Sequence, residues 1–184
     1  MTETEPTDLD YVWLGQAGDR RAFSRLVRRY QDRVYRFVLR MVNSHDEALE
    51  LTQDTFINAW QALPDWRPDA EFRTWLFRIA SNAAMDCLRR RKVVEFVALE
   101  EEYDAPAEGP GPEAQLQTKQ RLVALESALA RLPPDQREIL LLREVEDMSY
   151  AEIGATLGIN EGTVKSRLAR AREALISDRR RKDI

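Results

Sequence analysis

Apolar residues recur at intervals of three and four along most of this chain, and this spacing constrains the fold more than any other feature. It is clearest between residues 23 and 41, at Phe23, Leu26, Val27, Tyr30, Val34, Phe37, Val38 and Met41. Such a spacing puts the side chains on one face of an α-helix. No segment alternates apolar and polar residues in the two-residue period of a strand. The sequence therefore predicts an all-α fold.

Further helices are predicted from the same spacing and from the residues that begin or interrupt them. Ser44-His45-Asp46-Glu47 matches a capping box, which opens a helix through Leu51, Phe56 and Trp60. The remaining helices are expected near residues 72–91, 114–132 and 139–145, with breaks at Pro64, Pro68 and Pro133-Pro134.

Residues 95–113 interrupt this pattern. They contain three prolines, two glycines and seven acidic residues but no basic one, and they lack a sustained apolar period. That composition is typical of a flexible linker. The sequence therefore predicts two small helical domains, at residues 1–94 and 114–184.

The stretch after residue 148 has the pattern of a helix-turn-helix. Ser149-Tyr150-Ala151-Glu152 forms a capping box, and Gly158 stands where a helix would end. In the next helix, an apolar stripe runs through Val164, Leu168, Ala171 and Leu175. The outward face then carries Thr163, Lys165, Ser166, Ala169 and Arg170. Short polar and cationic side chains on such a face suit base edges and phosphates, the alternative being an ordinary solvated surface.

The net charge of −4 conceals segments that are alternately acidic and basic. Basic residues outnumber acidic ones by seven to one in residues 21–45, six to one in residues 72–94 and eight to three in residues 162–184. Residues 46–71 reverse this, with seven acidic residues and one basic residue. A polyanion such as DNA responds to the electric field of the nearby side chains rather than to the net charge of the whole protein. The separate basic blocks therefore favour two contacts with nucleic acid. A solvated surface explains any single block equally well.

Several other classes of protein are disfavoured. The single Cys87 excludes an internal disulfide, and its place on the stripe of Ile79 and Ala83 predicts a buried thiol. The only histidine, His45, has no metal-ligand cluster around it, so we expect no metal, cofactor or catalytic site. No apolar stretch is long enough to cross a membrane, and the acidic start is unlike a signal peptide. A cytoplasmic protein is expected.

Four motifs occur in a specific order. They are Asp54-Thr55-Phe56-Ile57-Asn58-Ala59-Trp60, Phe72-Arg73-Thr74-Trp75-Leu76-Phe77-Arg78-Ile79-Ala80-Ser81-Asn82, Leu132-Pro133-Pro134-Asp135-Gln136-Arg137-Glu138, and Gly162-Thr163-Val164-Lys165-Ser166-Arg167 with Ala169-Arg170-Ala171-Arg172. With them the chain resembles, over essentially its whole length, bacterial extracytoplasmic function (ECF) sigma factors. These two-domain proteins direct RNA polymerase to promoters.

The resemblance implies that the second domain binds the −35 element as duplex DNA. Lys165, Ser166, Ala169 and Arg170 fall where family members meet base edges. Ser149, Tyr150, Thr163 and Arg167 are expected at phosphates. Arg167 and Arg172 have an alternative, which is to pair with Glu161 and Glu173 on the surface.

The resemblance also implies that the first domain binds the −10 element as a melted single strand. The loop of residues 65–71 would form a pocket for a flipped base, and Asn82 would read a base edge. The residues expected at this element are Trp66, Arg67, Asp69, Phe72, Asn82, Arg89, Arg90 and Arg91. Trp66 could instead anchor the loop in the core, and Asn82 could be an ordinary surface residue. The basic residues from Arg89 to Lys92 would end their helix and bind backbone phosphates. Positive charge at the C-terminal end of a helix also interacts favourably with the helix dipole.

The implied partners are core RNA polymerase, at its β′ clamp and β flap, promoter DNA and an anti-sigma factor that could hold the protein at the inner membrane face. The polymerase contacts would come from Glu50, Leu51, Gln53, Asp54 and Phe56. Two residues depart from the family pattern: Glu50 stands where Asp is common, and Asp86 where some relatives carry a basic residue.

Two other classes of function remain as alternatives. A helix-turn-helix regulator that acts without polymerase would share the second domain but leave the motifs at 54–60 and 72–82 unexplained. A nucleic-acid-processing enzyme would need a metal or nucleophile cluster. Asp46, Glu50 and Asp54 do not supply one, because they form a single-helix stripe without partner ligands.

Overall fold

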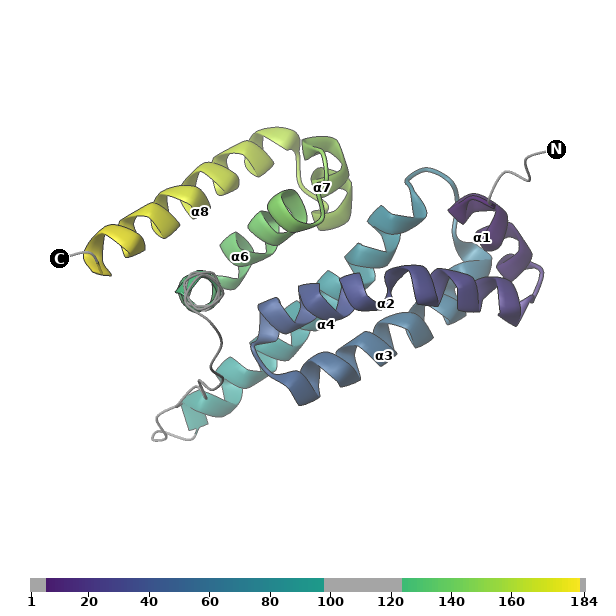
Figure 1. The fold of residues 1–184 in the computed structure, drawn as a ribbon, viewed down its shortest axis with the longest axis horizontal. Coiled ribbons are helices and arrows are strands. Elements are labelled where there is room, and N and C mark those ends of the chain that lie inside the picture. Colours follow the sequence, from purple (N-terminus) through teal and green to yellow (C-terminus); the bar gives the residue numbers. More distant parts are fainter. Residues whose placement is uncertain (1–5, 98–123, 183–184) are drawn as a thin grey trace, which may run out of the picture.

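The computed structural model describes residues 6–97 and 124–182, and the regular elements in these two ranges are all helical (Figure 1). The first range, called here the first domain, contains α1 (Asp8–Gln16), α2 (Arg20–Val42), α3 (His45–Ala62), the 3₁₀ turn η1 (Leu63–Asp65) and α4 (Phe72–Val97). The second domain contains a short helix over 124–131, α6 (Pro134–Leu140), the π-helical turn η2 (Leu141–Val145), α7 (Tyr150–Leu157) and α8 (Glu161–Lys182). The all-α prediction is confirmed.

Helix α2 forms the centre of the first domain, as the apolar spacing predicted. Asp19 caps it by accepting hydrogen bonds from the main-chain N–H groups of Arg21 and Ala22. Its apolar face is buried against α1, α3 and α4, and Phe37 meets Phe77 of α4 edge to face at 5.4 Å between ring centres. Aromatic pairs in this geometry add stabilisation beyond the area that they bury.

Helix α1 was not predicted. Thr7 begins it with a capping box, in which its hydroxyl accepts from the N–H of Asp10 and the Asp10 carboxylate accepts from the N–H of Thr7. The signal was present in the sequence, but with Asp in place of the usual Glu or Gln. Val12 is fully buried, so the helix is part of the core.

Two predicted helix boundaries and one predicted cap need correction. Helix α4 continues to Val97 rather than ending near residue 91. The helix expected at 139–145 begins at Pro134 and becomes a π-helical turn at Leu141. The Ser44 cap is only half of a capping box, because the carboxylate of Glu47 binds Arg91 instead of the N–H of Ser44. Of the expected helix at 114–132, residues 124–131 are helical, while residues 98–123, with most of the expected linker, lie outside the described ranges.

The helix-turn-helix is formed as predicted. Ser149 and Glu152 form the complete capping box of α7, and Gly158 ends the helix in the left-handed conformation with φ of 67°. The structure adds a second glycine with a specific role. A Cβ atom on Gly154 would lie 2.8 Å from the main-chain oxygen of Ile159, so the chain can return closely over α7 only without a side chain there.

The two domains lie side by side. Helix α4 packs against α6 and α7, and α2 packs against α6. Figure 1 shows α6, α7 and α8 along one side of the first domain, with α7 next to the first half of α4. None of the described helices is long and apolar enough to cross a membrane.

Candidate nucleic-acid interface

The outward face of α8 is open to solvent at the positions predicted to read bases. Val164, Leu168 and Ala171 are buried beneath it. The side chains left exposed on the opposite face are those of Lys165, Ser166, Ala169 and Arg170, while Thr163 and Arg167 are half-buried. The hydroxyl of Thr163 is already engaged with the side chain of Asn160 at the start of the helix, 3.1 Å away.

Tyr150 joins the first helix of this motif to the second. The guanidinium of Arg143 lies 5.3 Å from the centre of its ring, and Nζ of Lys165 lies 5.9 Å from the same centre. Both distances are within the range of cation–π attraction. The two cations and Tyr150 therefore form one positively charged patch at the N-terminal end of α8.

Arg172 does not make the surface pair that was considered for it. Its guanidinium binds the carboxylate of Glu144 at 2.6 Å, rather than Glu161 or Glu173. This pair fastens α8 to η2 within the second domain.

An open hollow of about 520 Å³ lies between the loop that joins η1 to α4 and the helices α1 and α2. Its lining residues are Thr7, Asp8, Leu9, Arg29, Trp66, Pro68, Ala70, Glu71 and Phe72. Trp66 and Phe72 are only 8% and 3% exposed. The two aromatic residues therefore anchor the loop in the core and also form part of the hollow. Arg67 and Asp69 are exposed on the loop and do not line it.

Gln16 holds this loop in place, a role that no local sequence pattern indicates. Its side-chain amide donates hydrogen bonds to the main-chain oxygens of Leu63, at 3.0 Å, and Trp66, at 2.8 Å. One side chain at the end of α1 thus satisfies two carbonyls at the start of the loop.

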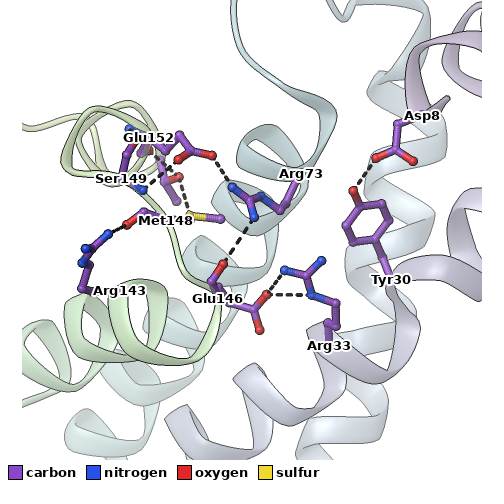
Figure 2. A network of polar contacts seen from close by, with 10 residues as sticks. Asp8, Tyr30, Arg33, Arg73, Arg143, Glu146, Met148, Ser149 and Glu152 are labelled. Atoms are coloured by element: carbon purple, nitrogen blue, oxygen red, sulfur yellow. Dashed lines mark hydrogen bonds and ion pairs between the residues drawn. The ribbon is translucent and has the colours of Figure 1, made fainter.

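The polar wall of the hollow comes from α1 and α2. The Asp8 carboxylate accepts hydrogen bonds from Arg29 and from the hydroxyl of Tyr30, and the latter bond is drawn in Figure 2. Burial and the neighbouring Asp8 raise the pKa of Tyr30. The phenol therefore stays protonated and acts as a donor.

Asn82 is exposed on α4, ten residues after Phe72. At 1.5 Å per residue, it lies roughly 15 Å along the helix from the hollow. Arg89 and Arg90 are exposed further along the same helix, and Arg89 pairs with Asp86 at 2.9 Å. Because α4 continues to Val97, these residues do not end it, and the alternative of favourable charge at a helix end does not apply to them.

Arg91 is used within the first domain. Its guanidinium binds the carboxylate of Glu47 and donates to the main-chain oxygen of Val42 at 2.8 Å. It therefore ties α4 to the end of α2 and the start of α3, rather than projecting freely toward a phosphate.

The acidic helix α3 presents Glu50, Gln53 and Asp54 to solvent. Leu51 and Phe56, which the sequence placed among the polymerase contacts, are only 7% and 8% exposed and pack in the core. Two apolar residues of α3 that were not expected at this contact are exposed: Leu49 at 54% and Ile57 at 53%. They lie four residues on either side of Gln53 and share its face.

A polar network joins the two domains (Figure 2). Arg33 of α2 binds the Glu146 carboxylate with its Nε at 2.9 Å and its Nη2 at 2.7 Å. Arg73 of α4 donates to the main-chain oxygen of Glu146 at 3.3 Å and also binds the carboxylate of Glu152. The sequence does not reveal these pairs, because their members are between 73 and 113 residues apart.

Two neighbouring charged residues of the Leu132–Glu138 motif are buried at the same interface. Arg137 is 7% exposed and donates only to main-chain oxygens, including that of Met41 in α2. Glu138 is 6% exposed and accepts from the hydroxyl of Ser81 in α4. Burial raises the pKa of Glu138 to about 7, although the Ser81 hydrogen bond and the charge of Arg167 act in the opposite direction.

Cys87 is buried, as predicted, in the face of α4 that meets the core. Burial and the nearby Glu47 raise the pKa of its thiol, which keeps it in the unreactive protonated form. Among the described residues, no three His, Cys, Asp or Glu side chains are grouped so that they could hold a metal ion.

Comparison with known proteins agrees with the two domains. The family model described as "Sigma-70 region 2" matches residues 26–93, and "Sigma-70, region 4" matches residues 122–175. The ECF RNA polymerase sigma factor SigE of Mycolicibacterium smegmatis is 44% identical over 156 residues, which cover 84% of this chain. The chain spans 60% of the length of that relative.

Two further likenesses extend over nearly whole chains. The RNA polymerase sigma-H factor of Pseudomonas aeruginosa is 36% identical over 180 residues, covering 94% of this chain and 93% of the relative. The solved structure of CnrH, in complex with the cytosolic domain of CnrY, has a TM-score of 0.71 and 28% identity, and covers 92% of this chain and 95% of that one. The motifs, the two helical domains and these likenesses agree, and the chain belongs to the ECF group of bacterial RNA polymerase sigma factors.

Proposed function

We propose that this protein binds core RNA polymerase and directs it to promoters, with the first domain on a melted −10 element and the second on a −35 duplex. The observation that most strongly supports the proposal is that a single chain combines an open helix-turn-helix face with a separate hollow bounded by aromatic side chains. Duplex DNA is read by a helix in the major groove, whereas melted DNA is held by stacking and by capture of flipped bases.

For the −35 element, the proposal places the N-terminal end of α8 in the major groove. Lys165 and Arg170 are then the donors to base edges, and Ser166 and Ala169 lie between them on the exposed face. Tyr150 and Arg143 lie beside the start of this face, where the DNA backbone would pass. Contacts to the backbone set the register, and contacts to base edges set the sequence preference.

For the −10 element, the hollow beside Trp66 and Phe72 receives the flipped base. A volume of about 520 Å³ is ample for one nucleobase, and the lining combines aromatic rings with the charged Arg29 and Glu71. Asn82 is too far along α4 to touch the same base and would read another nucleotide of the strand. Arg89 and Arg90 then follow the backbone beyond it, and Arg91 acts by holding α4 in position.

For polymerase, the proposed docking face is the exposed side of α3, formed by Leu49, Glu50, Gln53, Asp54 and Ile57. Its acidic residues would be repelled by DNA but suit a basic protein surface. The two exposed apolar side chains would supply the desolvated centre that protein interfaces need. In this proposal the polymerase performs the chemistry of RNA synthesis.

An anti-sigma factor is the proposed regulator. The sigma factor RpoE of Bartonella quintana, which the chain resembles over 83% of its length with a TM-score of 0.64 and 28% identity, was solved in complex with the anti-sigma factor NepR. If the anti-sigma factor of the present protein is membrane-bound, it would hold the protein at the inner face of the membrane.

Reconstituted transcription tests the proposal. Core polymerase would be incubated with the full chain and with fragmented genomic DNA from its source, and the transcripts mapped. We expect transcripts that begin at a small set of shared promoter sequences and that disappear when the chain is omitted. The helix-turn-helix regulator would instead bind duplex DNA without associating with core polymerase. Failure of the chain to co-purify with core polymerase would decide for that alternative.

A further inference from the structure

The first half of α2 carries a dense group of arginines, to most of which the proposed function gives no role. Residues 20–29 contain five arginines and no acidic residue. Four of the five recur at intervals of i, i+4, i+7 and i+8, and all four are exposed. They share one face of the helix, called here the α2 arginine face: Arg21, Arg25, Arg28 and Arg29.

These charges are unfavourable for the helix that carries them. The first turn of α2 contains Arg21 but no acidic residue, and positive charge there opposes the helix dipole. Arg25 lies four residues from both Arg21 and Arg29, a spacing at which like charges repel. Within the described part of the chain, the guanidinium groups of Arg21, Arg25 and Arg28 make no ion pair or hydrogen bond, while Arg29 binds Asp8. Charges that act against the fold are typical of a functional surface.

The chemistry of the face suits a chain of phosphates. All eight basic residues of α2 are arginines, and a guanidinium can give two parallel hydrogen bonds to the oxygens of one phosphate. From Arg21 to Arg29 the helix rises roughly 12 Å, the length of three to four nucleotides at 3.4 Å each. A nucleic-acid backbone therefore matches both the kind of charge on this face and its length.

The face adjoins the hollow proposed for the flipped base. Arg29 belongs to both, because it lines the hollow together with Trp66 and Phe72. Its guanidinium also lies over the ring of Tyr11, 5.6 Å from the ring centre. DNA held in the hollow would therefore meet the α2 arginine face directly.

The packing of α2 on α4 fixes the direction in which the face extends. Tyr30 meets Phe72 at the start of α4, with 5.8 Å between ring centres, and the main-chain oxygen of Val42 meets Arg91 near its end. The two helices thus run side by side from these first residues onward, and the part of α2 before Tyr30 projects past the start of α4. Figure 1 shows this part of α2 beside α1. The face therefore lies on the opposite side of the hollow from Asn82.

We propose that the α2 arginine face binds the phosphate backbone of the DNA strand that leaves the hollow on the side opposite to Asn82. The proposal rests on the proposed function of the hollow and extends its binding site. The strand is then held on both sides of the flipped base, with base reading along α4 and backbone contacts along α2. Phosphate contacts fix the position of a strand but carry no sequence preference.

A triple variant tests the face in the full chain. Arg21→Gln/Arg25→Gln/Arg28→Gln removes three charges and keeps Arg29, which lines the hollow. Lysine at the same three positions keeps the charge and removes only the guanidinium. Arg20→Gln is the matched control, since Arg20 is also exposed but is turned by roughly 100° from Arg21 around the helix. Because the charges repel one another, we expect the glutamine variant to melt no lower than wild type, so that weaker binding would not reflect unfolding.

Binding is measured with holoenzyme assembled from core polymerase and each form of the chain. The probes are labelled single strands from a promoter mapped by reconstituted transcription: the −10 element alone, and the same element extended by about six nucleotides on its 5′ side or on its 3′ side. Fluorescence anisotropy gives the affinity of each strand over a range of salt concentrations.

We expect the glutamine triple variant to bind one of the two extended strands roughly three- to tenfold more weakly than wild type, with little change on the other two probes. On that strand the salt slope should fall by about two units, which corresponds to three lost phosphate contacts on single-stranded DNA. The lysine variant should keep most of the slope, and Arg20→Gln should behave like wild type.

Three results would overturn the proposal. The glutamine variant could bind all three strands like wild type, or it could weaken all three equally, which would place its effect in the hollow. It could also fail to co-purify with core polymerase, which would assign the face to a protein contact. A wild-type holoenzyme that binds none of the strands contradicts the proposed function itself, whereas wild-type binding that the triple variant retains in full contradicts only the role of the α2 arginine face.

Discussion

The guanidinium of Arg137 in α6 donates a hydrogen bond to the main-chain oxygen of Met41, one residue before the end of α2. Its other hydrogen bonds go to the main-chain oxygens of Leu129, Ala130 and Leu132, around the end of the short helix over 124–131. One buried cation thus lies at the C-terminal ends of two helices, where the carbonyl groups lack partners and the dipole is negative. Burial lowers the pKa of this arginine, and the positive charge of Arg91 lowers it further.

We predict that Arg137→Ala destabilises the protein by about 3 kcal/mol or more, because it leaves several buried carbonyls without donors. Arg137→Lys should rescue only part of this loss, since an ammonium group cannot span the same fork of acceptors. Urea unfolding followed by circular dichroism measures both, with Arg170→Ala as an exposed control. If Arg137→Ala and the control unfold at the same urea concentration, the hydrogen bonds of Arg137 make no net contribution to stability.

The buried carboxyl of Glu138 predicts a pH dependence. Its pKa is raised from the ordinary value of 4.5 to about 7, mainly by burial and also by the charge of Asp135, while the Ser81 hydrogen bond and the charge of Arg167 oppose the change. A raised pKa means that the folded, closed state binds the proton more tightly. The stabilising contribution is therefore complete below pH 4.5 and is lost as the pH rises through 7.

We expect the free energy of unfolding to fall as the pH rises from 4.5 to about 7, by an amount on the order of 1–3 kcal/mol, and the melting temperature to fall with it. Glu138→Gln keeps the size and a hydrogen-bonding amide, and should flatten this dependence. Differential scanning calorimetry across the pH range gives the comparison. If the melting temperature of Glu138→Gln changes with pH in the same way as that of wild type, another group causes the pH dependence.

The docking face on α3 predicts a loss of polymerase binding in Gln53→Ala/Asp54→Arg. The change removes an amide and reverses a charge at the centre of the face, between Leu49 and Ile57. A matched control exists in α2, where Gln31 and Asp32 are also adjacent and exposed. Gln31→Ala/Asp32→Arg should bind core polymerase like wild type in a pull-down. Equal recovery of polymerase by both double variants would remove α3 from the interface.

Asn82→Ala should reduce transcription and relax base preference at one position of the −10 element, with affinity for a −35 duplex unchanged. An amide side chain offers both a donor and an acceptor to a base edge, and alanine offers neither. Transcription from promoters randomised at each −10 position reports the preference, and Asn58→Ala, an exposed asparagine of α3, is the control. Identical preferences in wild type and Asn82→Ala would show that this amide reads no base.

Arg170→Ala should cost about 1–3 kcal/mol on the native −35 duplex and blur the preference at one position. Arg167→Ala, if it removes a phosphate contact, should weaken native and scrambled duplexes alike and lower the salt slope by about one unit. Salt titrations of both variants on both duplexes separate the two roles. Equal weakening of both duplexes by Arg170→Ala would assign that residue to the backbone.

Local sequence determined the elements. Apolar spacing placed the buried faces of α2 and α8, and the Ser149 capping box with Gly158 placed both ends of α7. These signals act over three or four residues, the distance at which helical side chains and caps interact, so they can be read without knowledge of the fold. The ordered motifs identified the family for the same reason, since each lies within one helix or at its start.

Tertiary structure decided which polar groups would be partners. In the sequence Arg91, Arg137 and Glu138 cannot be told from exposed charges, yet each binds a group more than 40 residues away. The same packing put Leu51 and Phe56 in the core and left Leu49 and Ile57 exposed. A periodic pattern shows that a helix has an apolar face, but the width of that face is set by the neighbours that cover it. The closed arrangement of the two domains follows from such distant pairs, whose strength depends on the distance and burial that only folding creates.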